Sequence, residues 1–133
     1  MRREVGYAPA GHRRGRIDIA LSDGPGADAF VEVKNVTLLD GDRVRFPDAV
    51  SERGRKHLGL LRAAVEEGLR GVILFAVNRP EGECFAPAWS VDPAYAGCLR
   101  DVVAAGVEAL AVRIRHTAGG METAGLLPLD LSR

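Results

Sequence analysis

The chain has 133 residues, of which 47% are hydrophobic and 27% are charged, and its formal net charge is +0. These values are typical of one globular domain with a single core, and they exclude disordered and fibrous proteins. No apolar run approaches the roughly 20 residues that cross a bilayer, so we expect a cytoplasmic protein with no membrane association. Cys84 and Cys98 lack metal-ligand spacing, which predicts two reduced thiols.

The first third of the chain has the pattern of short strands. Residues before Gly6 are too few for more than a helical turn, and a loop follows them. Residues 16–21 and 29–36 alternate apolar with polar side chains and predict two strands, and residues 43–46 predict a third. Because the links between these strands are short, they predict an antiparallel meander.

A helical pattern follows, in which Leu58, Leu61 and Val65 recur at helix spacing. Pro47-Asp48 opens the helical stretch, either Asp48 or Ser51 can be its N-cap, and Gly68 is placed to end it. Residues 71–77 are then apolar without alternation, which is typical of a strand covered on both faces.

The last third repeats this order. Asp92-Pro93 has the favoured order for a helix start, and the helix is expected to end near Gly106. Residues 107–114 predict a further strand, which completes a second βαβ unit. The sequence therefore predicts one α/β domain, with a mixed β-sheet flanked by helices.

The predicted strands carry a possible set of catalytic side chains. Glu32 and Lys34 are two residues apart, so they share one face of a strand, with Cα atoms about 6.6 Å apart. Asp18 stands between Ile17 and Ile19 on the preceding strand. If the strands pair, Asp18 and Glu32 can hold Mg²⁺ and Lys34 can stabilise a phosphate, which is the minimum for phosphodiester hydrolysis. The alternative is that all three lie on the solvated face of an antiparallel sheet.

The first half of the chain is also modestly basic, although such clusters are usually only a solvated surface. The candidate nucleic-acid contacts are Arg16, Arg53, Arg55, Lys56 and His57. A structural alternative exists here too, since Glu52 and Lys56 have the spacing of a helical ion pair.

Several ordered motifs resemble one known family. They are Arg2-Arg3-Glu4-Val5, Arg16-Ile17-Asp18, residues 31–38, residues 46–50, Glu52-Arg53-Gly54, Lys56-His57-Leu58 and Asp92-Pro93-Ala94-Tyr95. Together they are similar to the sugar fermentation stimulation protein (SfsA) family, and the correspondence runs along essentially the whole chain. The family often has serine where Gly15 stands, so any hydroxyl contact there is lost.

This resemblance implies a restriction-endonuclease-like, PD-(D/E)XK core over residues 1–133. In that pattern Asp18 is the strand aspartate, Glu32 and Lys34 form the second half-motif, and Glu4 is a helix carboxylate that adds a metal ligand. The implied cofactor is Mg²⁺ or Mn²⁺. The family usually carries an OB-fold-like domain ahead of this core, and the chain begins at the core.

Two hypotheses of function follow. One is a metal-dependent nuclease acting on DNA or RNA, with Asp18, Glu32 and Lys34 as its catalytic residues. The other is a non-catalytic DNA-binding regulator of sugar (maltose) metabolism genes that uses the same fold as a scaffold. In both, the partner is nucleic acid and assembly as a homodimer is left open.

Overall fold

The fold is that of a computed structural model, which describes residues 2–7, 15–21 and 28–133, with side chains described from residue 28 onward. Its main element is a six-stranded sheet in the order β1-β2-β3-β6-β8-β9. These strands are β1 (Arg2–Tyr7), β2 (Gly15–Leu21), β3 (Ala29–Val36), β6 (Arg70–Val77), β8 (Glu108–Thr117) and β9 (Gly120–Leu127). A smaller sheet contains β4 (Leu38–Asp40), β5 (Arg43–Phe46) and β7 (Cys84–Pro87) in the order β4-β5-β7.

At strand β3 the large sheet changes from antiparallel to parallel pairing. This strand pairs antiparallel with β2 and parallel with β6, and β6 pairs parallel with β8. The mixed α/β class and both predicted βαβ connections are therefore confirmed, with α1 (Glu52–Glu66) between β3 and β6 and α2 (Pro93–Ala104) between β6 and β8.

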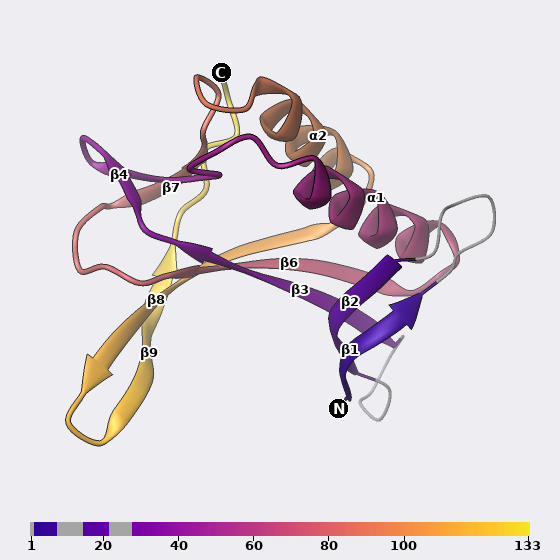
Figure 1. Cartoon of the computed structure of the whole chain (residues 1–133), viewed down its shortest axis with the longest axis horizontal. Helices are drawn as coiled ribbons and strands as arrows, with labels where there is room; N and C mark the ends of the chain where they lie inside the picture. The colour runs from indigo at the N-terminus through magenta and orange to yellow at the C-terminus, as the bar shows by residue number, and fades with distance from the viewer. Residues whose placement is uncertain (1, 8–14, 22–27) are drawn as a thin grey trace.

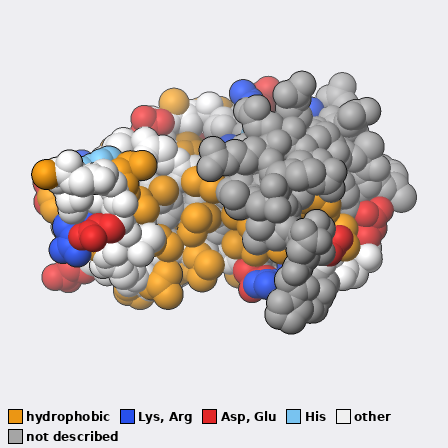
Figure 2. Space-filling view, turned by 90° about the horizontal axis from the view of Figure 1, so that it is seen from below, with side chains coloured by type: hydrophobic (Ala, Val, Ile, Leu, Met, Phe, Trp, Pro, Cys, Tyr) orange, Lys and Arg blue, Asp and Glu red, His pale blue; other side chains and the backbone are white. Residues whose placement is uncertain are grey.

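Both helices lie on the same side of the large sheet (Figure 1). Helix α1 packs on β2, β3 and β6, and α2 packs on α1 and β7. Figure 2 views the molecule from the opposite side and shows hydrophobic side chains gathered across the sheet near the β8–β9 hairpin. None of the helices in the described ranges is long and apolar enough to span a bilayer.

The core fills the space between the helices and the two sheets. Ile73, Phe75 and Val77 of β6 are completely buried, as the unbroken apolar run predicts. The rings of Phe75 and Phe85 stack at 4.1 Å between centroids, which joins the large sheet to β7 of the small one. Cys84 and Cys98 are both free thiols.

The helix ends follow the sequence closely. Of the two N-cap candidates, Ser51 caps α1 by accepting a hydrogen bond from the Gly54 N–H at 2.9 Å, so the helix begins later than Pro47-Asp48. Asp92 caps α2 by accepting from the Tyr95 N–H at 3.0 Å. Gly68 adopts a φ of +84° directly after α1, a conformation that favours glycine.

Two expectations about the strands are wrong. The residues before Gly6 form β1 rather than a turn, because pairing with β2 overrides their weak local preference. Residues 43–46 do not extend the meander of the large sheet. They form a local hairpin with residues 38–40 about Gly41, whose φ is +64°, and join the small sheet.

No pattern in the sequence predicted strands β4, β7 and β9. Glu4, which the family pattern places on a helix, lies in strand β1.

Candidate active site

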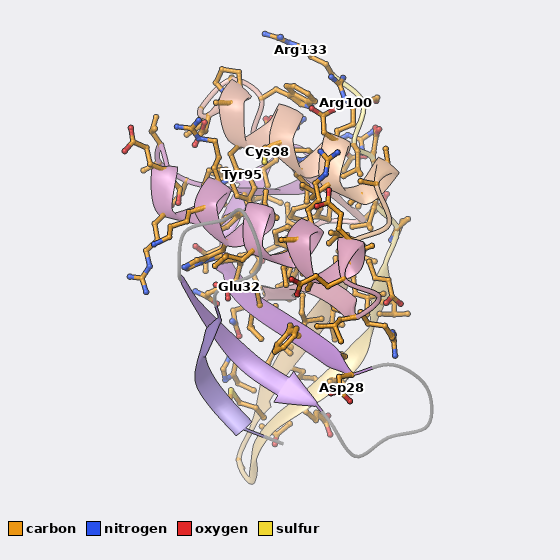
Figure 3. The ribbon with its side chains drawn as sticks, turned by 90° about the vertical axis from the view of Figure 1, so that its right-hand side faces the viewer. Asp28, Glu32, Tyr95, Cys98, Arg100 and Arg133 are labelled. Carbon is orange, nitrogen blue, oxygen red and sulfur yellow. The ribbon has the colours of Figure 1, made fainter. Side chains whose placement is uncertain are left out.

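Glu32 and Lys34 of β3 lie on the face of the sheet that α1 covers. Their side chains are 3% and 17% exposed, and the Lys34 Nζ atom lies 2.9 Å from Glu32 Oε1. The expectation that they share a face is confirmed, whereas the alternative of a solvated face does not hold for Glu32. Figure 3 shows Glu32 between the sheet and the beginning of α1. A carboxylate and an ammonium group are therefore held together in a largely dehydrated environment.

His57 reaches the same carboxylate from α1. Its Nδ1 atom lies 2.7 Å from Glu32 Oε1 and 3.0 Å from Lys34 Nζ. An ionised carboxylate is only an acceptor, so the 2.7 Å contact requires a hydrogen on Nδ1. Glu32 Oε1 thus accepts from both His57 and Lys34, and Nδ1 is not free to accept from Lys34.

The ionisation of Glu32 follows from these contacts. Burial raises the pKa of this carboxyl, but the hydrogen bonds from His57 and Lys34 and the electrostatic attraction of these side chains outweigh it, so the pKa lies below its usual range. Glu32 is consequently a carboxylate at neutral pH despite being buried.

The second oxygen of Glu32 is different. Oε2 is buried and has no hydrogen-bond partner among the described residues. The same is true of the Tyr95 hydroxyl, whose pKa is raised by burial and further by neighbouring groups that include Glu32. A buried polar atom without a partner costs about 1–3 kcal/mol, so Oε2 is an acceptor available to a ligand.

Backbone register places Asp18 beside Glu32. Ile19 of β2 lies opposite Val31 of β3, and Asp18 and Glu32 are the next residues on the two strands. Glu4 in turn lies between Arg3 and Val5, whose partners Ile19 and Ile17 flank Asp18. The side chains of Glu4, Arg16 and Asp18 lie outside the described part of the structure.

The basic residues proposed as nucleic-acid contacts separate on α1. Arg53 and Lys56 are exposed, whereas Arg55 is half-buried. Burial raises the pKa of the Cys98 thiol of α2, and the charge of Arg55 partly opposes this increase. His57 is buried, with 8% of its surface exposed. The helix therefore directs two of these side chains to solvent and one into the site.

A buried carboxylate fixes the start of this helix. Asp92 Oδ2 accepts a hydrogen bond from the Ser51 N–H at 2.8 Å, while its Oδ1 caps α2. Tyr95 packs against Gly54, since a Cβ atom there would lie 3.0 Å from the Tyr95 ring. These contacts hold the first turn of α1, and with it His57, over β3.

The sequence did not predict the contact of His57 with Glu32, nor the position of Tyr95 beside the first turn of α1. One signal was present: His57 stands four and seven residues before Leu61 and Ala64, which is the spacing of the apolar face of a helix. Within the described residues, no group of three or more histidine, cysteine or acidic side chains has the geometry of a metal site.

Comparison with known proteins agrees with the resemblance seen in the sequence. The family model described as "Sugar fermentation stimulation protein RE domain" matches residues 1–120. A sugar fermentation stimulation protein homolog of Geobacter metallireducens is 49% identical over 98% of this chain and 55% of its own length. The homolog of Pelobacter propionicus is 50% identical over 85% of this chain and 47% of its own length.

A solved structure gives the same result. The structure of Pyrococcus furiosus SfsA in complex with Ca²⁺ has a TM-score of 0.84 and 28% identity, covering 98% of this chain and 54% of that one. The chain spans about half the length of the curated relatives it matches. It belongs to the sugar fermentation stimulation protein family.

Proposed function

We propose that the chain is a metal-dependent nuclease that hydrolyses phosphodiester bonds of DNA or RNA and that its large sheet is a PD-(D/E)XK core. The observation that carries the proposal is Glu32, a buried carboxylate whose Oε1 is held by Lys34 and His57 while its Oε2 has no partner among the described residues. Asp18 stands next to it in the register of the sheet.

The residues present fit a hard divalent cation. Mg²⁺ and Mn²⁺ prefer oxygen ligands, and Mg²⁺ is commonly held by one or two carboxylates plus substrate phosphate. Glu32, through Oε2, and Asp18 would hold the ion, and Glu4 on the neighbouring strand is a further carboxylate. When bound, such an ion neutralises charge on the phosphate and acidifies its water. The Pyrococcus furiosus relative was determined in complex with Ca²⁺, another oxygen-seeking cation, which supports this assignment.

Lys34 supplies fixed positive charge beside the reacting phosphate. Its ammonium group is only partly exposed and is anchored on Glu32, so its charge is less screened than at a surface. In this position it stabilises the extra negative charge that develops on the phosphate during attack. Arg53 and Lys56 are exposed on the same helix as His57 and would contact the nucleic-acid backbone.

One observation favours a second candidate, a non-catalytic DNA-binding regulator of sugar metabolism genes. Lys34 and His57 already supply hydrogen bonds to Glu32 within the chain, so this carboxylate is partly satisfied with no metal. In that case binding to DNA would be salt-sensitive, weakened by neutralising Arg53 and Lys56, and unaffected by chelator.

The test is a cleavage assay on plasmid DNA and on single-stranded DNA and RNA, with Mg²⁺ or Mn²⁺ and with chelator. Glu32→Gln, Asp18→Asn and Lys34→Met are each expected to lower the rate about 100-fold or more. Glu122→Gln, which alters an exposed carboxylate on β9, is the matched control and should cut like the wild type. Equal cutting by all of these proteins would identify a contaminant and refute the nuclease.

A further inference from the structure

We propose that His57 is a positioning residue of this site rather than a nucleic-acid contact. Its Nδ1–H holds Glu32 Oε1 and thereby turns Oε2 toward the cation. The inference rests on the proposed function, which assigns Glu32 to the metal. It gives His57 a role that its position in a basic stretch of sequence does not suggest.

Burial argues against a contact with the nucleic-acid backbone. His57 is 8% exposed, and Gly54, Leu58 and Leu61 on the same face of α1 are also buried. Arg53 and Lys56, by contrast, are exposed. A phosphate in solvent would therefore contact Arg53 and Lys56 first, whereas the imidazole is buried between α1 and β3.

The two donors to Oε1 differ in rigidity. Lys34 carries its ammonium group on a flexible four-carbon stem, so its contact alone leaves the carboxylate free to turn. The imidazole is a planar ring with two rotatable bonds, and its Nδ1 atom lies 2.7 Å from Oε1. His57 is therefore the donor that can fix the plane of the carboxylate and keep Oε2 as the open oxygen.

The position of the ring is itself fixed. The Ser51 cap and its link to Asp92 hold the first turn of α1, and the helix packs on β3 and β6. His57 lies one turn beyond this anchored start. Side chains that orient a metal ligand without binding the metal typically contribute about 10- to 100-fold to metal affinity or activity.

The test compares three substitutions by titration calorimetry with Mn²⁺ on the full chain. His57→Asn places an amide N–H near the position of Nδ1, His57→Gln places it near Nε2, and His57→Ala removes it. We expect Ala and Gln to weaken Mn²⁺ binding about 10- to 100-fold, with Asn close to the wild type. His116→Asn, at an exposed histidine of β8, is the matched control and should not change the affinity.

Crystal structures of His57→Ala and His57→Asn give a readout that is independent of metal. The carboxylate of Glu32 should rotate in the first and keep its orientation in the second. An unchanged Mn²⁺ affinity in His57→Ala, or an unmoved Glu32 in its structure, would overturn the role of His57. If the wild type itself binds no Mn²⁺, the proposed function fails, and the orientation of Glu32 in the two structures still decides whether His57 positions it.

Discussion

Replacing Lys34 by methionine should reveal how strongly its ammonium group is coupled to Glu32. The substitution keeps most of the apolar stem and removes the charge that lies 2.9 Å from Oε1. Because the carboxylate stays buried and ionised, it loses one of its two donors. The variant should therefore unfold more easily than the wild type.

The magnitude follows from the exposure of the pair. Solvent-exposed pairs contribute about 0–1 kcal/mol, whereas breaking a fully buried pair costs about 3–5 kcal/mol. The Glu32 and Lys34 side chains are 3% and 17% exposed, and His57 remains as a donor, so the value lies between these limits. We expect Lys34→Met to lower the free energy of unfolding by about 2 kcal/mol, the usual worth of a hydrogen bond to a charged group.

A double-mutant cycle with Glu32→Gln isolates this interaction. Urea unfolding followed by circular dichroism at pH 7 should give a coupling energy of about 1–2 kcal/mol between residues 32 and 34. The matched control is the exposed pair of Arg70 and Glu108, where Arg70→Met and Glu108→Gln should be nearly additive because water screens both charges. A coupling between Lys34 and Glu32 no larger than that of the control would refute the reasoning.

Three further predictions concern stability. Asp92→Ala should lower the free energy of unfolding by about 2–3 kcal/mol in urea, because the Ser51 and Tyr95 N–H groups both lose their acceptor, and Asp92→Asn should cost less. Since the pKa of Glu32 in the folded state lies below its ordinary value of 4.5, its stabilising effect is complete above that pH and is lost as the pH falls through the folded pKa. Unfolding free energies measured between about pH 5 and pH 3 should therefore fall more steeply for the wild type than for Glu32→Gln, and parallel curves would contradict the assignment. Gly71→Ala should destabilise by about 1–3 kcal/mol, because the added Cβ would lie 2.6 Å from the Leu61 carbonyl oxygen, whereas Gly97→Ala, with open space around it in α2, should stabilise by about 0.5–1 kcal/mol in thermal unfolding.

The elements that could be predicted from the sequence are those that carry their own pattern. The strands predicted at residues 29–36 and 71–77 alternate or are wholly apolar, and the starts of α1 and α2 carry capping side chains. Strand β9 carries no such pattern, because most of its residues are exposed. It forms by pairing with the free edge of β8.

The candidate site divides in the same way. The shared face of Glu32 and Lys34 follows from the two-residue repeat of a strand, which is a local property. The contact with His57 depends on how α1 crosses β3, which no spacing along the chain specifies. The smaller sheet, which includes residues 43–46, could not be predicted for the same reason. It depends on the pairing of β5 with β7, which lies far along the chain.

All the groups assigned to the chemistry, apart from Glu4, lie within residues 15–66, on β2, β3 and α1. The strands and the helix beyond Glu66 support them without adding a proposed ligand or charge. Recombination between relatives could therefore exchange this segment as one unit and carry most of the proposed reaction centre with it, while the later strands only have to keep their shape.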